Sequence, residues 1–222
     1  MPNTFIPVLE ETGAINEVGR WVLKEACFES ARLRAAGHQL TMAVNVSMKQ
    51  LGSDAFLDEI SDALESSGVD ATTLELEVTE AAIMTEADSI AERLARIKAL
   101  GVRIAIDDFG TGYSSLAYLR QFPIDSIKID RSFIAAISDS PAAATVIQTL
   151  VQLGQRLGLN TLAEGIEQPS QLEYLQGQHC DYGQGFILTQ PLAPPDLATF
   201  LDSYRQQRAL VPEQAATATV DR

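Results

Sequence analysis

The stretch Leu74-Glu75-Leu76-Glu77-Val78-Thr79 decides the fold class of this chain. Its side chains alternate between apolar and polar, which is the period-2 pattern of a β-strand with two different faces. Residues 42–47 and 126–130 alternate in the same way. Each of these strands therefore has one apolar face and one polar face.

Similar runs recur along the chain and alternate with longer segments of helical period. This order is typical of repeated βα units around a parallel sheet. The expected strands are 42–47, 74–79, 103–107, 126–130, 160–164 and, with a weaker pattern, 182–188. The expected helices are 16–35, 55–66, 86–100, 141–157, 170–177 and 195–206.

The polar faces distinguish between the two common parallel-sheet folds. A doubly wound sheet is covered by helices on both sides, so its strands are apolar throughout. In a (β/α)₈ barrel the outward face packs on helices while the inward face fills the lumen. We therefore expect an α/β fold, a TIM-like (β/α) barrel with a charged lumen. About six of its eight strands are recognisable, so the barrel is expected to be incomplete at its N-terminus.

Length and composition bound the organisation and the partners. The 222 residues suit one domain, which we expect over 1–209, followed by a disordered tail over 210–222. The formal net charge of -14 argues against DNA, RNA or an anionic membrane surface as a partner. Two cysteines make no disulfide framework, and no apolar run reaches the length of a membrane span. We therefore expect a cytoplasmic protein without membrane insertion.

Polar residues gather where the expected strands end at their carboxyl side, which is the rim where barrel enzymes place their active sites. Each alone has a structural explanation, such as the start of a turn or a solvated loop. Together, however, four carboxylates on one rim would repel one another, and they and the lysine would lose solvation, at a cost in free energy unless cations were bound there. Oxygen ligands without histidine or cysteine favour Mg²⁺ or Mn²⁺, and adjacent aspartates suit a two-metal site. The residues concerned are Asn45, Glu77, Asp107, Asp108, Lys128, Glu164 and Gln184.

The pair Asp107-Asp108 predicts an irregular strand. Consecutive strand residues point to opposite faces, so both can serve one site if the strand breaks or bulges there. The glycine-rich stretch 110–115 that follows supplies the freedom for such a turn and reads as a rim loop. A plain βα turn is the alternative.

The motifs also resemble a known family. Six of them, in order, are similar to the motif set of EAL-domain cyclic-di-GMP phosphodiesterases: Asn45-Val46-Ser47, Glu77-Val78-Thr79-Glu80, the stretch 106–116, Ile127-Lys128-Ile129-Asp130, Ala163-Glu164-Gly165-Ile166-Glu167 and Gln184-Gly185-Phe186. The opening Phe5-Ile6-Pro7 with Glu10 resembles the family's stretch just after its first two strands.

The resemblance implies metal-dependent hydrolysis of cyclic-di-GMP to the linear dinucleotide in bacterial second-messenger signalling. It implies that one ion is held by Asn45, Glu77 and Asp107 and a second by Asp107, Asp108 and Glu164. The catalytic residues it implies are Lys128, which orients and polarises water, Glu164, and Gln184, which positions that water or the lysine.

The same resemblance assigns supporting roles outside the ligand set. Glu80 and Glu167 are implied to lie behind the ligands, with Glu80 anchoring the loop from Phe109 to Ser115, which includes Thr111 and Gly112. The family commonly uses this loop and its neighbouring helix for dimer contact, so a homodimer is expected.

One departure from the family pattern bears on activity. The Glu-Ala-Leu motif, followed closely by an arginine, belongs on a strand before Phe5-Ile6-Pro7, and residues 1–5 contain nothing like it. An ion ligand and a phosphate-contacting arginine are therefore missing, and low or no activity is expected. A second hypothesis is an inactive cyclic-di-GMP receptor or protein-interaction scaffold. A third is a different barrel enzyme, such as a metal-dependent lyase acting on enolates.

Overall fold

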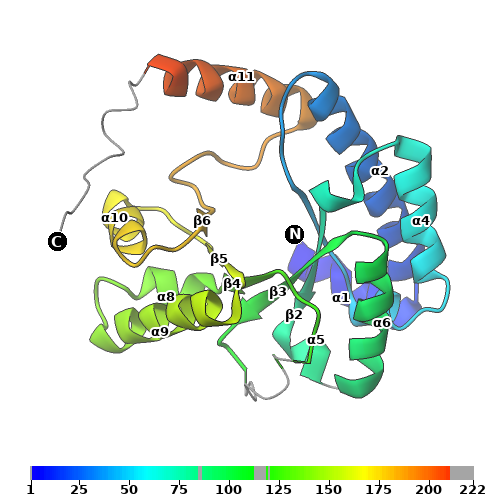
Figure 1. Ribbon diagram of the computed structural model, residues 1–222, viewed down its shortest axis with the longest axis horizontal. Coiled ribbons are helices and arrows are strands. Elements are labelled where there is room, and N and C mark those ends of the chain that lie inside the picture. Colours follow the sequence, from blue (N-terminus) through cyan, green and yellow to red (C-terminus); the bar gives the residue numbers. More distant parts are fainter. Residues whose placement is uncertain (1, 85–86, 113–118, 120, 211–222) are drawn as a thin grey trace.

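The six expected strands form one parallel sheet. The computed structural model describes residues 2–84, 87–112, 119 and 121–210. The strands are β1 (Met42–Asn45), β2 (Leu74–Thr79), β3 (Arg103–Phe109), β4 (Ser126–Ile129), β5 (Asn160–Ala163) and β6 (Tyr182–Gly183). They are hydrogen-bonded in the order of the chain, and each neighbouring pair is parallel. The sheet curves into a half-barrel that is open between β1 and β6 (Figure 1). The TIM-like α/β fold and its incompleteness are thus confirmed.

Most helices lie on the outside of this half-barrel, and α11 crosses its open side (Figure 1). The long ones are α2 (Ile15–Ala35), α4 (Phe56–Ser67), α6 (Ala87–Ala99), α9 (Pro141–Leu157), α10 (Pro169–Gly177) and α11 (Pro194–Leu210). The others are α1 (Pro2–Thr12), α3 (Met48–Leu51), η1 (Ala71–Thr73), α5 (Glu80–Met84) and α8 (Arg131–Ala135). Most of the long helices lie within two residues of their expected bounds, and α11 ends later than expected.

The alternation of side chains sorts the sheet into two faces, as the sequence predicts. The apolar set of β2, Leu74, Leu76 and Val78, is buried in the core shared with the helices. Across the sheet, Lys128 of β4 contacts Glu77 of β2, so the polar sets of these strands meet on the inner side. Burial of the apolar set drives the fold, and it forces the polar set into the lumen.

The structure corrects several expected strand ends, two of them through short helices. Ser47 is the N-cap of α3 in a capping box with Gln50, and Asp130 is the N-cap of α8, accepting from the Ser132 N–H. Both residues were expected to continue a strand. Their side chains instead accept hydrogen bonds from backbone N–H groups in the first turn of each helix, which have no partner within the helix. The last strand is also shorter than 182–188, since the Ile187 N–H donates to the Ile166 carbonyl in a turn after Gly183.

Helix α1 was not expected from the sequence, because Pro7 within it suggests a break. At the other end, α11 includes Leu210, one residue beyond the expected domain boundary. Residues 211–222 lie outside the described part, so the tail stays a prediction.

Candidate metal centre

Acidic side chains from β2, β3 and the residue after β5 converge on one lysine of β4 at the carboxyl end of the sheet. Lys128 Nζ lies 2.8 Å from Glu77 Oε2, 3.0 Å from Asp107 Oδ1 and 2.6 Å from Glu164 Oε1. The lysine side chain is 4% exposed, so these ion pairs exclude bulk water. At the edge of the cluster, the Asn45 amide donates to Glu77 Oε2 over 3.0 Å.

The register of the sheet explains why residues far apart in sequence meet here. Asn45 pairs with Glu77 across β1 and β2, and Thr79 pairs with Asp107 across β2 and β3. Parallel strands end at the same edge, so their terminal polar residues share one rim.

Lys128 and the carboxylates of Glu77 and Glu164 shift one another's pKa. Burial raises the pKa of Glu77 and Glu164, although Lys128 opposes the rise in both. For Lys128, burial lowers the pKa, but the carboxylates of Glu77, Glu164 and Asp107 outweigh it, and the net pKa is raised. The ammonium therefore keeps its proton at neutral pH.

The expected irregularity at Asp107-Asp108 is confirmed. The register of β3 with β4 shifts between Ile106 and Phe109, and Asp108 has a φ of 53°, a left-handed conformation uncommon for a non-glycine residue. The Asp108 N–H donates to Asp107 Oδ1 over 3.0 Å. This distortion lets consecutive aspartates serve one site.

Three of these side chains form a group that could hold a metal ion. Asp107, Asp108 and Glu164 each offer a carboxylate oxygen, and these oxygens all lie within 4.8 Å of one another. This trio coincides with the expected ligands of the second ion. All are half-buried oxygen donors, which suits a hard divalent cation.

The sequence did not single out Asp130, which lies near this group. Burial, the charges of Asp107 and Asp130, and a hydrogen bond with Asp130 raise the pKa of Asp108. Since Asp130 follows β4 as a helix cap, its position after Lys128 was a signal that could have revealed it.

Glu80 contacts the loop after β3, as the resemblance implied. Its Oε2 accepts from the Gly110 N–H over 2.7 Å, and the side chain is buried. A Cβ added at Gly112 would lie 2.8 Å from Glu80 Oε1, so glycine permits the close approach. Thr111 Oγ1 donates to the Asp108 carbonyl over 2.8 Å. Residues 113–115 of this expected loop lie outside the described part of the chain, so the expected dimer contact stays a prediction.

Gln184 and Glu167 lie on a groove beside the clustered carboxylates. Both are exposed and line a groove of about 520 Å³ whose wall includes Glu164. The Glu167 N–H donates to Gln171 Oε1, and no bond from the Gln184 side chain to Lys128 is seen among the described residues. The groove also contains two residues that the sequence did not indicate as site residues, the cation Arg131 and the exposed aromatic Phe186.

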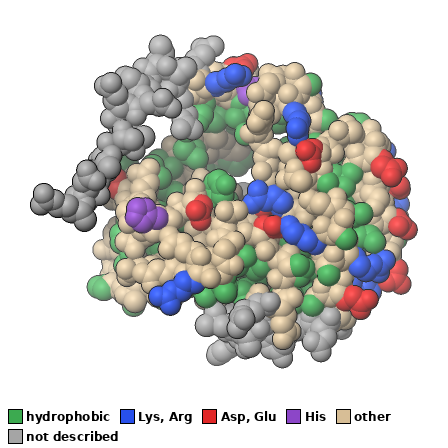
Figure 2. Space-filling model, in the orientation of Figure 1, with side chains coloured by type: hydrophobic (Ala, Val, Ile, Leu, Met, Phe, Trp, Pro, Cys, Tyr) green, Lys and Arg blue, Asp and Glu red, His purple; other side chains and the backbone are tan. Residues whose placement is uncertain are grey.

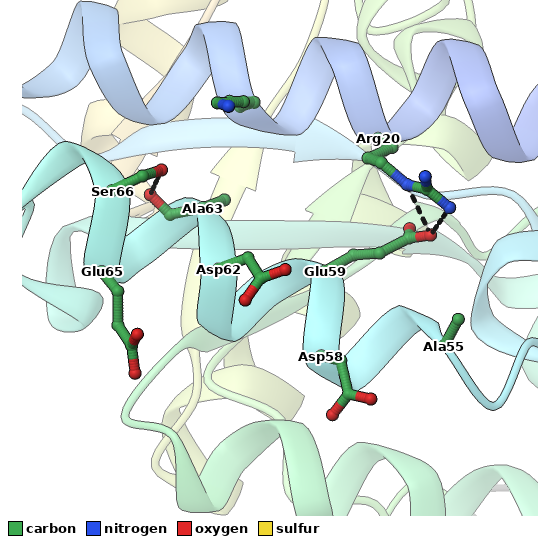
Figure 3. A pocket seen from close by; sticks show the side chains of 9 residues that line it. Arg20, Ala55, Asp58, Glu59, Asp62, Ala63, Glu65 and Ser66 are labelled. Atoms are coloured by element: carbon green, nitrogen blue, oxygen red, sulfur yellow. Dashed lines mark hydrogen bonds and ion pairs between the residues drawn. The ribbon is translucent and has the colours of Figure 1, made fainter.

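A larger groove of about 730 Å³ lies elsewhere, between α2 and α4 (Figure 3). There Arg20 of α2 reaches Glu59 of α4, with Nη2 2.5 Å from Oε1 (Figure 3). Its lining comes from these two helices and Ala55, whereas the clustered carboxylates belong to the strand ends. It is therefore a helix junction separate from the candidate metal centre.

The ordered motifs and this geometry agree with a family assignment, since residues 1–191 match the EAL domain. The chain belongs to the EAL-domain family. Among the described residues of this EAL domain, no helix combines the length and apolar character needed to cross a bilayer.

Relatives of this EAL domain carry related names. Cyclic di-GMP phosphodiesterase NbdA of Pseudomonas aeruginosa is 44% identical over 205 residues, which is 92% of this chain but 26% of that protein. Signaling protein YkoW of Bacillus subtilis is 38% identical over 200 residues, 90% of this chain and 25% of that protein. The chain thus spans about a quarter of the length of these two relatives.

Solved structures confirm the fold of this EAL domain. The PaMucR phosphodiesterase in complex with c-di-GMP matches with a TM-score of 0.86 and 39% identity, over 89% of this chain and 80% of that one. BlrP1 of Klebsiella pneumoniae, in a calcium and c-di-GMP complex, matches with a TM-score of 0.73 and 27% identity, over 81% of this chain and 45% of that one.

Proposed function

We propose that this EAL domain carries the site for metal-dependent hydrolysis of cyclic-di-GMP to the linear dinucleotide. The observation that supports it most is the buried Lys128 among Glu77, Asp107 and Glu164, beside three oxygens close enough to share an ion. A lysine held among carboxylates that can bind metal ions suits a site at which water attacks a phosphodiester. The names of NbdA and of the PaMucR complex point to the same substrate.

The proposed cofactors are two Mg²⁺ or Mn²⁺ ions. Asp107, Asp108 and Glu164 would hold one, and Asn45 and Glu77 would hold the other together with Asp107. The donor chemistry fits, because every residue of both sets offers an oxygen atom. All of them are carboxylates except Asn45. When bound, such ions neutralise phosphodiester charge and make water more acidic.

Lys128 would act through its fixed charge and its hydrogen atoms. Since the pKa of Lys128 is raised, the ammonium is a poor general base and a good donor to a water or a phosphoryl oxygen. Glu164 would hold this ammonium in place over 2.6 Å while also serving an ion. Gln184, on the wall of the same groove as Glu164, would position the attacking water.

The groove beside Glu164 is the proposed place for the dinucleotide. It joins the metal centre to Arg131, whose guanidinium suits a phosphate, and to Phe186, which is 54% exposed and can stack on a base. A cation and an exposed aromatic next to a site for divalent ions suit a nucleotide phosphodiester.

Activity of residues 1–222 by themselves is proposed to be low. In the family pattern the Glu-Ala-Leu motif completes the ligands of the ion near Asn45, and residues 1–222 contain no Glu-Ala-Leu sequence. Asn45 is exposed in the structure, so this half of the centre is open to water. The second candidate function, an inactive cyclic-di-GMP receptor or scaffold, rests on this observation.

Two measurements separate these functions. The purified chain is incubated with cyclic-di-GMP and Mn²⁺, and the linear product is followed for wild type, Lys128→Met and Glu164→Gln. Slow turnover that both substitutions abolish supports the enzyme. Calorimetry with Ca²⁺ and the dinucleotide that shows binding without turnover supports the receptor. The absence of both binding and turnover rejects the enzyme and the receptor and leaves the scaffold.

We also propose a cytoplasmic location, a homodimer, and no binding of DNA or RNA. Both cysteines are free thiols, which suits a reducing compartment, and the net charge of -14 disfavours polyanions. Sedimentation of the purified protein over a range of concentrations tests the dimer.

A further inference from the structure

Helix α11 crosses the open side of the half-barrel without an apolar anchor. None of the side chains described within it, from Pro194 to Arg205, is buried. Figure 1 shows its amino-terminal part beside the end of α2, from which it extends toward the side of the molecule that carries α10. Figure 2 shows this face hollowed below the helix, with hydrophobic side chains around the hollow. A helix with so little buried surface depends on specific polar contacts for its position.

Two such contacts join α11 to the last turn of α2 and to the segment that follows it. His38 Nε2 lies 3.3 Å from Asp202 Oδ1, with the imidazole 6% exposed and the carboxylate 67% exposed. Nearer the amino-terminal end of α11, Arg32 Nη2 donates to the Pro194 carbonyl over 3.3 Å. The buried histidine is the fixed partner of the pair, and the exposed aspartate is the part that can leave.

The position of α11 affects the groove beside the metal centre. Leu197 of α11 lines that groove together with Glu164 and Arg131. The preceding Pro191 and Leu192 line it as well, and Pro191, Pro194 and Pro195 stiffen the connection by fixing φ. A shift of α11 therefore moves one wall of the groove.

We propose that His38 is a positioning residue, which holds α11 over the groove through Asp202 and so sets how tightly the groove encloses its ligand. The second half of this statement rests on the proposed function, because that function assigns the groove to cyclic-di-GMP. Detachment of Asp202 leaves the metal ligands in place and widens the groove, so it weakens dinucleotide binding without removing the ions.

The chain contains its own reporter for this movement. Trp21 is the single tryptophan of the 222 residues. It is 61% exposed and lines an apolar groove of about 420 Å³ together with Phe28, Met42 and Pro194. Because Pro194 begins α11, undocking of the helix removes part of the cover over Trp21 and shifts its emission to longer wavelength.

The test compares Asp202→Ala with a matched control, Asp196→Ala, which removes the same charge from an exposed position of the same helix. Asp202→Glu keeps a carboxylate and serves as the rescue. Trp21 emission is recorded without nucleotide, and the Kd for cyclic-di-GMP is measured by calorimetry with Ca²⁺. We expect Asp202→Ala to red-shift the emission and to raise the Kd for cyclic-di-GMP at least about threefold, with Ca²⁺ binding unchanged. Asp196→Ala and Asp202→Glu should behave as wild type.

The two measurements test different parts of the proposal, the emission testing the helix contact and the affinity testing its link to the groove. If Asp202→Ala and Asp196→Ala give the same emission as wild type, His38 does not hold α11 and the proposal is overturned. If emission shifts while dinucleotide affinity stays constant, the link to the groove is wrong. If wild type binds no dinucleotide, the proposed function fails, and the emission still decides whether the contact holds the helix. A His38→Gln variant that red-shifts the emission as Asp202→Ala does supports the pair from its buried side.

Discussion

Lys128 Nζ lies 2.6 Å from Glu164 Oε1, and this contact joins β4 to the residue that follows β5. The same ammonium reaches Glu77 and Asp107, so one buried cation balances carboxylates contributed by three other segments. Since these carboxylates are also the proposed ion ligands, Lys128 and the ions interact with the same negative charge. The first two predictions follow from this shared charge.

Lys128→Met should separate turnover from metal binding. The substitution keeps the apolar stem but removes the charge, so turnover should fall by about 10²-fold or more. Affinity for Mn²⁺ should rise, because the carboxylates lose their internal cation. Calorimetry with Mn²⁺ and a product assay measure the two effects. A variant in which metal binding falls together with turnover would show that the lysine acts by holding the ligands in place.

Glu164→Gln should weaken metal binding by at least about tenfold. It removes a charge from the trio Asp107, Asp108 and Glu164 while keeping the shape of the side chain. Glu173→Gln is the matched control, since Glu173 is an exposed glutamate of α10 outside the groove. Calorimetry with Mn²⁺ on both variants checks the result, and equal affinities for the two would remove Glu164 from the ligand set.

Gly112→Ala should destabilise the loop after β3. Its Cβ would lie 2.8 Å from Glu80 Oε1, which is too close, so Glu80 must move from the position in which it accepts from Gly110. We expect a loss of about 1–3 kcal/mol in the free energy of unfolding, as for other overpacked sites. Gly177→Ala is the control, because nothing lies within 4 Å of its added Cβ. Thermal unfolding of both variants decides, and equal midpoints would contradict the clash.

The effect of Mn²⁺ on stability should grow with pH. Burial raises the pKa of Glu77, Asp108 and Glu164, so each binds a proton in the folded state at a pH where the unfolded chain has lost it. In that window the metal-free protein loses stability from these groups as pH rises. Ions bind the ionised carboxylates, so their affinity rises over the same window.

The measurement is the difference in Tm with Mn²⁺ and with a chelator, recorded from about pH 4, near the ordinary carboxyl pKa, up to neutral pH. A difference that stays constant across this range would show that the three carboxyl groups do not bind the ions. Glu164→Gln should reduce the slope, since it removes one of the titrating ligands.

The sequence by itself determined the fold and most members of the site. Leu74, Leu76 and Val78 alternate with Glu75, Glu77 and Thr79, and burial of the apolar set forces the other set inward. Asp107-Asp108 could serve one site only if the strand was distorted, and the shift in register confirms this. These features depend on local spacing, which the sequence displays directly.

The tertiary structure decided which partner each polar side chain contacts. Ser47 and Asp130 cap helices, although each continues the alternating pattern of its strand, because orphan helix donors compete for their oxygens. Spacing placed Lys128 and the carboxylates on one rim, but it did not indicate which three carboxylates the lysine would contact. Nor did it indicate that His38 would meet Asp202, since such contacts depend on how curvature and helix packing bring distant segments together. Alternation fixes the face on which a residue lies, and packing across the sheet fixes its partner.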